Sequence, residues 1–440
     1  MPPPPTDVLV RALLHAPLPH ALAASGLTGP PDTHLPVIGI FSRRPLLSLP
    51  LSSPDGARVA VRAAREAAQT WGALSHTQRA PWSFRLQRAL AVRHAALLTV
   101  LQDVSGLGPA DAEAELRSAR ATLLRHAVAA GTHRAPWRRP RSDTPSSHAP
   151  QRPVVVMSHV DGARPLVSLL EGALPALLKG MTVVSETDHR TAVPTLAVLA
   201  AAREAGLPQG GWAVAVDRRT ADLRCVLAEH ADEVSPQCCA WDPWRPPPPG
   251  LLVLRHDGDA RAAARATVRS CFARAGRRCA ATPLVAVHDT RLTAFLDHLT
   301  RETARFRPAT ALPHRQWHTR LSEWTEAALG AGARPVRTGT PPGRARPPVP
   351  DPIVLMAPPH GVEDLPRPPL GPVALLVRFS AWAEALHLAR RTGPHLGVFT
   401  RTRLAQLSPQ LAGLASPHIQ LNAAPDAGLP PGMAHAGLGM

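Results

Sequence analysis

Apolar residues recur every three or four positions through residues 57–105, which is the spacing of one face of an α-helix. The pattern predicts two amphipathic helices there and a third helix over residues 110–130. Pro81 is expected in the first turn of the second helix, where its missing N–H costs little. The expected apolar faces are formed by Val59, Ala63, Ala67 and Trp71 in the first helix and by Leu86, Leu90, Ala91, Leu97, Leu98 and Leu101 in the second.

Short apolar runs alternate with helical runs in the next part of the chain. Strands that alternate with helices in this way predict a parallel, doubly wound sheet and therefore the α/β class. The expected elements are a strand at 153–157, a helix at 166–180, a strand at 181–185, a helix at 191–205 and a strand at 212–216.

A change of composition over residues 234–250 predicts a boundary between two domains. The segment ends in Trp-Arg-Pro-Pro-Pro-Pro-Gly, and such a proline run cannot form a helix or a central strand. A second α/β unit is expected after it, with an irregular loop at 335–352. The expected elements of that unit are a strand at 251–254, a helix at 290–305 and a strand at 373–378.

Proline-rich segments mark two further parts of the chain as irregular. Residues 1–35 form a proline-rich N-terminal segment. Residues 131–152 combine proline with serine and arginine, and we interpret them as an extended arm or, alternatively, as a solvated linker. The chain is therefore expected to divide into residues 1–35, 36–250 with the arm inside, 251–415 and a C-terminal segment, 416–440.

The chain has 440 residues and a formal net charge of +17, which raises the question of nucleic-acid binding. Lys and Asn each occur once and Tyr is absent, while Arg, Ala, Pro and Gly are abundant, a skew typical of GC-rich coding. The arginines are scattered along the chain rather than gathered into a basic stripe with aromatic residues. No nucleic-acid partner is therefore predicted.

Cysteine and histidine usage limits the redox and metal chemistry that is expected. Five Cys occur without a Cys-x-x-Cys pair, which favours a reducing compartment, and the 21 His are dispersed, so no metal site is predicted. The sequence opens on Met-Pro-Pro-Pro-Pro rather than on a signal segment. No apolar run reaches the ~18 residues of a membrane helix. A cytoplasmic protein without a membrane partner is expected.

One cysteine has surroundings that suit a nucleophile. A helix-like run over 262–272 ends shortly before Cys279, and an apolar, β-rich run follows at 283–287. A thiol at such a boundary is accessible, and Arg277 and Arg278 beside it would favour the reactive thiolate. The alternative, and the commoner fate of a single cysteine, is a small buried hydrophobe.

The stretch 271–288 resembles the nucleophile segment of the aldehyde dehydrogenase superfamily. Four other blocks resemble the family in the same order, and the resemblance spans roughly residues 35–440, nearest to the succinic-semialdehyde dehydrogenases. The matching residues of the first segment are Phe272, Ala275, Gly276, Cys279, Ala281, Val287 and His288. The other blocks are residues 64–80, 172–184, 201–210 and 370–373, the last reading Leu-Gly-Pro-Val.

The resemblance implies a fold, an activity and partners. The fold is two doubly wound parallel-sheet domains with an extended oligomerisation arm, and assembly into a homo-oligomer goes with that arm. Residues 36–250 resemble the cofactor-binding domain and 251–415 the domain of the catalytic thiol. The activity is NAD- or NADP-dependent oxidation of a small aldehyde, similar to succinic semialdehyde, through a thiohemiacetal on Cys279. In residues 416–440 the family's last strand is expected to be missing.

Most other signature positions of the family carry different residues here. The second oxyanion donor, an Asn, aligns with Ala163, and the Lys that binds the adenosine ribose aligns with Glu186. A carboxylate can bind ribose hydroxyls, so Glu186 stays the candidate cofactor-binding residue. The remaining positions, the phosphate loop, the general base and the nicotinamide-ribose Glu, align with residues 236–239, Trp244 and Pro368, and Asp242 is the nearest carboxylate to the base position.

These departures leave two hypotheses about function. The first is the family's oxidation of an aldehyde, with the backbone N–H of Cys279 as the remaining oxyanion donor and with activity weak or lost. The second is a non-catalytic, aldehyde dehydrogenase-like protein that acts as a binding or assembly subunit.

Overall fold

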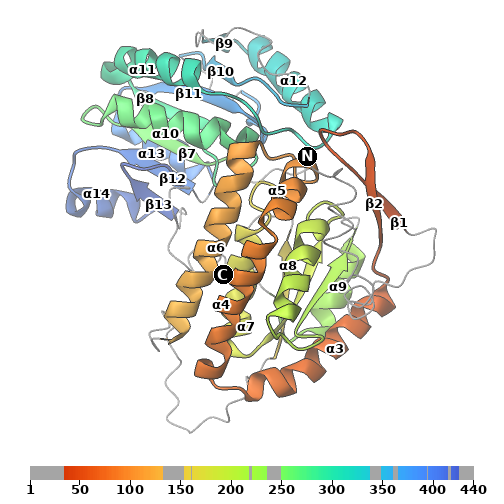
Figure 1. Cartoon of the computed structure of the whole chain (residues 1–440). Helices are drawn as coiled ribbons and strands as arrows, with labels where there is room; N and C mark the ends of the chain where they lie inside the picture. Colours follow the sequence, from red (N-terminus) through yellow and green to blue (C-terminus); the bar gives the residue numbers. More distant parts are fainter. Residues whose placement is uncertain are drawn as a thin grey trace. The chain divides into compact units, whose positions relative to one another are not determined.

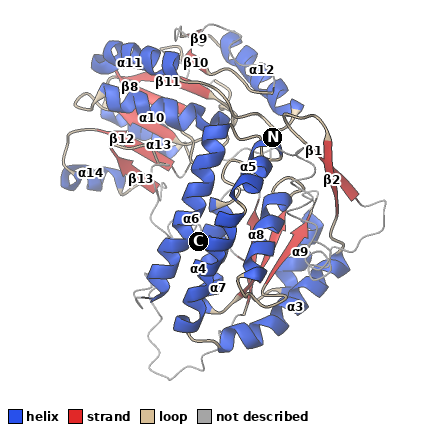
Figure 2. Ribbon diagram, viewed as in Figure 1, coloured by secondary structure: helices blue, strands red, loops and turns tan. Residues whose placement is uncertain are grey.

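The computed structural model describes residues 34–131, 153–159, 161–217, 221–234, 249–336, 348–359, 365–393, 395–414 and 418–425. The chain divides into two compact units, Met1–Cys238 with Pro430–Met440 and Cys239–Leu429. Each unit contains a sheet of largely parallel strands, drawn in red in Figure 2, with helices on both faces. The predicted α/β class with two doubly wound sheets is thereby confirmed, while the predicted arm lies outside the described residues.

The first unit opens with an antiparallel pair of strands and a series of helices before strands and helices alternate (Figure 1). Its elements are β1 (His34–Ile38), β2 (Pro45–Pro50), α3 (Pro54–Ala73), α4 (His76–Val92), α5 (His94–Asp103), α6 (Pro109–Gly131), β3 (Val154–His159), α7 (Val167–Lys179), β4 (Thr182–Thr187), α8 (Ala192–Glu204), β5 (Trp212–Val216), α9 (Ala221–His230) and β6 (Glu233–Val234). Each of the five elements predicted between residues 153 and 216 lies within two residues of its expected bounds.

The sheet of the first unit has the order β5-β4-β3-β6, and its neighbouring strands run parallel. Alternate side chains of β3 enter different cores, as the period of two along a strand requires. Val155 and Met157 pack with α7 and α8, whereas Val154 and Val156 pack with α3 and α9. Helices therefore cover both faces, and the carboxyl ends of β3 and β4 meet at one edge.

The buried face of α3 differs from the predicted one. Val59 is 47% exposed, whereas Ala60 and Ala64 are buried against the sheet. Ala67 and Trp71 are buried as predicted. Because alanine occurs on several sides of this helix, apolar spacing alone does not select the face that the sheet covers.

The helix α4 begins earlier than predicted. A capping box fixes its start: Ser75 Oγ accepts from the N–H of Gln78 at 3.3 Å, and Gln78 Oε1 accepts from the N–H of Ser75 at 2.8 Å. Pro81 therefore lies inside the helix and not in its first turn, which corrects the prediction. The predicted second helix is also divided, because α4 ends at Val92 and α5 begins at His94.

The second unit alternates strands and helices along most of its length. Its elements are β7 (Leu251–Leu254), α10 (Ala260–Phe272), β8 (Leu284–His288), α11 (Leu292–Arg305), α12 (Arg315–Gly330), β9 (Arg334–Pro335), β10 (Ile353–Met356), β11 (Val373–Phe379), α13 (Trp382–Arg390), β12 (His395–Phe399), α14 (Leu404–Leu411) and β13 (His418–Leu421). The strand order is β13-β12-β7-β8-β11-β10-β9, and only β9, of the described strands in this sheet, pairs antiparallel.

Two cores cover the faces of this second sheet. Leu252, Val285 and Leu376 pack with α10 and α11, while Leu284 and Leu375 pack with α12, α13 and α14. The predicted strand at 251–254 and the helix at 290–305 are confirmed, the latter as the 3₁₀ turn Asp289–Arg291 followed by α11. No helix in the described ranges has both the length and the apolar composition that crossing a bilayer requires.

Candidate active site around Cys279

The helix α10 leads the chain to Cys279. Asp259 caps its start, because its Oδ1 accepts from the N–H groups of Arg261 at 2.8 Å and of Ala262 at 3.1 Å. The N–H of Ala262 contributes most to holding the pKa of Asp259 below its usual range. The helix ends at Phe272, which is buried. The thiol segment therefore starts from a firmly capped and packed helix.

The backbone after α10 turns through three consecutive left-handed residues. Arg274, Ala275 and Gly276 have φ values of 54°, 55° and 62°. A non-glycine residue in this region costs on the order of 1–3 kcal/mol, so Arg274 and Ala275 hold strain that the surrounding packing must offset. A Cβ atom on Gly276 would lie 1.8 Å from the carbonyl oxygen of Gly371, which no side chain can tolerate. Glycine is therefore required at position 276.

This close approach joins two of the blocks that carry the family resemblance. Gly276 belongs to the nucleophile segment, and Gly371 belongs to the Leu-Gly-Pro-Val block just before β11. The far side of the loop is tied to α10 instead. The Oγ of Ser270 accepts from the N–H of Thr282 at 3.1 Å, and the thiol of Cys271 donates to the carbonyl of Thr282 at 3.1 Å. Both ends of the turn that carries Cys279 are thereby fixed.

Cys279 itself lies at the surface of this turn. The N–H of Ala281 donates to the carbonyl of Arg278 at 3.0 Å, which closes the turn around Cys279. Cys279 is partly exposed, whereas Cys271 is fully buried beside Phe272. Cys279 is therefore not the small buried hydrophobe that the sequence left open as the alternative, and among the described cysteines the thiol of Cys225, on α9, is also exposed.

Both neighbouring arginines donate hydrogen bonds to backbone carbonyl groups. Arg277 is buried, and it donates through Nη1 to the carbonyl of Ala311 at 3.1 Å, with its guanidinium 6.0 Å from the ring of Trp317. Arg278 donates through Nη2 to the carbonyl of Arg269 at 2.7 Å. Thiolate formation at Cys279 stays a prediction.

The position of the second oxyanion donor offers no side-chain hydrogen bond. Ala163 is 1% exposed, in the turn before α7. Its backbone N–H donates to Asp161 Oδ1 at 3.0 Å, and the N–H of Arg164 donates to the same oxygen at 3.0 Å. The methyl group cannot donate, and the backbone donor is already committed to Asp161.

Glu186 lies at the carboxyl end of β4, beside the end of β3. It is 8% exposed, and its carboxylate accepts a short hydrogen bond from Ser158 Oγ across the two strands. At the end of β3, His159 is 2% exposed, and burial lowers its pKa to about 4, so it is neutral at pH 7. This edge therefore carries a buried carboxyl group where the family places a cation.

These residues fit a dinucleotide poorly. Glu186 would repel a 2′-phosphate, and its carboxylate is already hydrogen-bonded. Pro368, at the position of the nicotinamide-ribose Glu, is buried and has no polar side-chain atom. The remaining candidates, Trp244, Asp242 and residues 236–239, lie outside the described residues. Among the described residues, no cluster of His, Cys, Asp and Glu could hold a metal ion.

The crevice of the second sheet is closed by a hydrogen-bonded turn. The connection after β7 leads to β8 on one side, and the connection after β12 leads to β13 on the other. Open α/β sheets commonly bind ligands at such a point, between the two strands whose connections diverge. Asp257 fills this place and accepts from Thr400 Oγ1 at 2.9 Å and from Thr402 Oγ1 at 2.8 Å. Burial opposes its charge, but these hydrogen bonds outweigh it and lower the pKa of Asp257 to about 2. The turn is a structural anchor.

Comparison with known proteins places this arrangement in context. The model of the "Aldehyde dehydrogenase family" matches residues 29–232 and 251–434. A 3,6-anhydro-alpha-L-galactose dehydrogenase from Streptomyces coelicolor is 26% identical over 420 residues, covering 84% of this chain and 81% of that protein.

Solved structures show the same fold at lower identity. Succinate-semialdehyde dehydrogenase from Burkholderia pseudomallei superposes with a TM-score of 0.76 at 17% identity, covering 89% of this chain and 87% of the other. NADP-dependent glyceraldehyde-3-phosphate dehydrogenase from Bacillus halodurans C-125, complexed with NADP, has a TM-score of 0.76 at 17% identity, covering 90% and 88%.

Proposed function

This chain belongs to the aldehyde dehydrogenase family, and from that membership we propose that it attacks a small aldehyde with the thiol of Cys279, while NAD(P)-dependent turnover is weak or lost. The observation that carries the proposal is the accessible turn of Cys279, fixed by the contact of Gly276 with Gly371 on one side and by Ser270 on the other. The proposal includes a cytoplasmic location, which rests on the absence of a paired cysteine framework in the sequence.

The first chemical step needs only the thiol and its own backbone. The thiolate of Cys279 attacks the carbonyl carbon, a C–S bond forms, and the electron pair of the carbonyl double bond moves to oxygen, giving the alkoxide of a thiohemiacetal. The N–H of Cys279 would be the donor that stabilises this oxygen. Without a partner from Ala163, the step loses a factor of roughly 10²–10³ in rate.

The later steps lack the groups that the family uses. Trp244 and Pro368 stand where carboxylates would act, and a missing general base costs roughly 10²–10⁴ in rate. We therefore propose that acyl transfer to water is the slowest step of any turnover. Succinic semialdehyde is the first substrate to test, and the anhydro sugar aldehyde suggested by the Streptomyces relative is the second.

A second candidate function is a non-catalytic binding or assembly subunit. It is favoured because Ala163, Glu186 and Pro368 replace signature residues of the family, and a fold can persist after its chemistry is lost. Under either function the protein is expected to form a homo-oligomer through the segment 131–152.

Intact-mass spectrometry with each aldehyde separates the two functions. With NAD or NADP at several millimolar, the first predicts at most one reduced cofactor per thiol and one acyl adduct per chain. Cys279→Ala should abolish the adduct, and Cys225→Ala, which removes an exposed thiol on α9, should not. Steady turnover without an adduct would mean that a base acts that we have not assigned, and Asp242→Asn would test it. No adduct and no reduced cofactor would support the binding subunit.

A further inference from the structure

Thr282 lies where the turn that carries Cys279 leads into strand β8. It is fully buried, as are Ser270 and Cys271 at the end of α10. The N–H of Thr282 donates to Ser270 Oγ at 3.1 Å, and its hydroxyl donates to the same oxygen at 3.0 Å. Its carbonyl accepts from the thiol of Cys271 at 3.1 Å. The end of one helix therefore holds the N–H, the hydroxyl and the carbonyl of Thr282.

The segment before β7 packs against the same residue. A Cβ atom on Gly250 would lie 2.6 Å from the carbonyl oxygen of Ala281 and 3.2 Å from the methyl carbon of Thr282. Real Cβ atoms do not approach backbone oxygen this closely, so only glycine lets the two segments meet as they do. Thr282 is thereby held between α10 and the start of β7.

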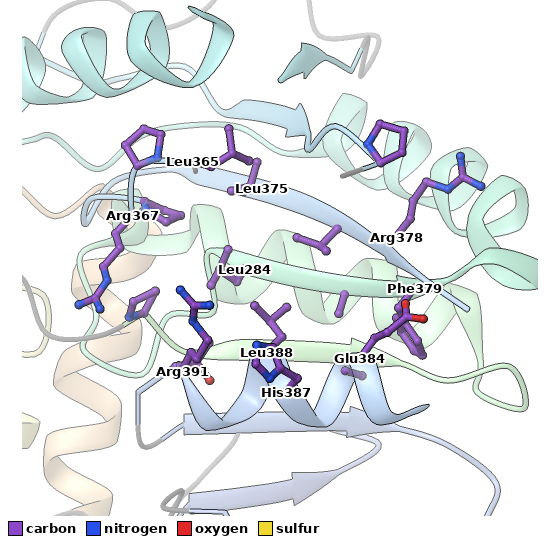
Figure 3. Close-up of a pocket in the computed structure, with 18 residues that line it drawn as sticks. Leu284, Leu365, Arg367, Leu375, Arg378, Phe379, Glu384, His387, Leu388 and Arg391 are labelled. Carbon is purple, nitrogen blue, oxygen red and sulfur yellow. The ribbon is translucent and has the colours of Figure 1, made fainter. Parts of the chain in front are cut away.

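The residue after Thr282 restricts it further. Pro283 disfavours a helical backbone at the residue that precedes it. The carbonyl of Pro283 accepts from the N–H of Leu375 at 2.7 Å, and Leu375 pairs with Leu284 between β11 and β8. Figure 3 shows Leu284 and Leu375 on these two strands. The thiol turn therefore ends at a fixed point of the sheet.

We propose that Thr282 is a positioning residue for the attack of Cys279 on a carbonyl carbon, a role that rests on the function proposed above. Attack at a bound carbonyl requires the sulfur in one place and direction, and a displacement of about 1 Å can cost on the order of 10²-fold in rate. Alkylation by a small reagent from solution requires only an accessible thiolate. Loss of the Thr282 hydroxyl should therefore affect aldehyde addition much more than alkylation.

The reversible addition step provides the measurement. The thiol adds across the carbonyl double bond: a C–S bond forms, and the thiol proton ends on the carbonyl oxygen, so no cofactor is consumed. An aldehyde bound in this way protects Cys279 from iodoacetamide. Protection gives the affinity for the aldehyde, and the alkylation rate without aldehyde gives the reactivity of the thiol.

Peptide mapping of the full chain, alkylated with and without succinic semialdehyde, tests the role. Thr282→Val removes the hydroxyl and keeps the branched shape, so it should weaken protection about tenfold. The alkylation rate without aldehyde should stay within about twofold, as expected for an exposed sulfur. Thr282→Ser keeps the hydroxyl and should keep protection within about threefold of the parent chain.

A second buried hydroxyl on α10 offers a matched control. Thr267 is fully buried, and its Oγ1 donates to the carbonyl of Ala263 at 2.9 Å, inside the helix. Thr267→Val should lower the thermal stability about as much as Thr282→Val does, because each loses one buried hydrogen bond. It should leave both the protection and the alkylation rate unchanged, since Thr267 has no hydrogen bond to the turn.

The outcomes separate this role from the proposed function. Protection of the parent chain that Thr282→Val leaves unchanged, or that Thr267→Val weakens equally, would overturn the positioning role and leave the proposed function standing. An alkylation rate that falls in proportion to protection would show a change of thiol accessibility alone and would overturn the role too. If neither aldehyde named above protects the parent chain, the proposed function fails and the role fails with it.

Discussion

The segment around Cys279 in the second unit keeps the residues of the family, whereas the edge formed by β3 and β4 in the first unit does not. Near the thiol, the backbone of Gly276 lies against the backbone of Gly371, and no residue with a side chain fits at position 276. At the edge, Glu186 is hydrogen-bonded by Ser158 across the strands. The comparison teaches that close backbone packing constrains a segment more strongly than a side-chain function at a strand end, where local hydrogen bonds can satisfy a replacement.

Substitution of Gly276 tests most directly whether backbone packing fixes the segment that carries the thiol. Gly276→Ala places a Cβ in the carbonyl of Gly371 and forces a left-handed alanine, so we expect a loss of about 4 kcal/mol or more in the free energy of unfolding. Urea unfolding measures it. Gly330→Ala, at the end of α12 with nothing within 4 Å of the new Cβ, is the control and should be neutral or stabilising. A variant with unchanged stability would show that packing does not fix this loop.

Dinucleotide affinity tests the other side of the comparison. Glu186 stands where the family has a cationic side chain, so NAD and NADP should bind with a dissociation constant no lower than about 1 mM. This affinity is about a thousandfold, or roughly 4 kcal/mol, weaker than that of a micromolar site. Glu186→Gln should improve NADP binding more than NAD binding, because it removes repulsion of the 2′-phosphate. Calorimetry on both forms measures this, and micromolar binding to the parent chain would mean that we have misaligned the edge.

The two regions should also differ in their response to acid. Burial lowers the pKa of His159, at the end of β3, from 6.5 to about 4. The unfolded chain takes up this proton near pH 6.5 and the folded chain only near pH 4, so stability falls across that interval, by about 3 kcal/mol at its lower end.

His159→Gln should remove this part of the loss between pH 7 and pH 4.5, as measured by urea unfolding. His126 shifts in the same direction, mainly through burial, so the remaining loss is not zero. His256→Gln, an exposed position in the second unit, is the control and should leave the pH dependence as it is. An identical pH profile for the parent chain and His159→Gln would contradict the prediction.

The smallest expected effect concerns the reactivity of the thiol. Under limiting iodoacetamide, Cys279 should be labelled about tenfold faster than the exposed Cys225, as a modest stabilisation of its thiolate would produce. Cys271, which is buried and donates to Thr282, should be labelled only after local unfolding. Peptide mapping gives the order. Faster labelling of Cys225 would show that the engaged guanidinium groups of Arg277 and Arg278 leave the sulfur unperturbed.

The fold was predictable where apolar runs are short and clearly bounded. The strands β3, β4 and β5 were expected almost at their observed bounds, because each is a continuous apolar run between helical segments. The helices α12 and α13 were not predicted, although buried Trp317 and Trp324 lie seven positions apart on α12, a spacing that could have indicated a helix.

Errors arose where composition made the pattern ambiguous. Alanine occurs on several sides of α3, so the sequence could not show that Val59 points outward. Pro81 was taken as a start signal, but the capping box of Ser75 and Gln78 decides where α4 begins. In both cases the local pattern correctly indicated a helix. The packing of the sheet decided which face of α3 is buried, and the capping box decided where α4 begins.

The α/β class, the family and the position of Cys279 after a helix could be predicted from the amino-acid sequence, because they depend on local periodicity and on short blocks of residues. The burial of Cys271 and the partial exposure of Cys279 depend on the tertiary structure, since exposure is set by what packs around each thiol. The tertiary structure also decided that Arg277 and Arg278 bond to distant carbonyl groups and that Gly276 meets Gly371. Contacts between residues far apart in the chain carry no local signature, and they exist only once the sheet and its helices have assembled.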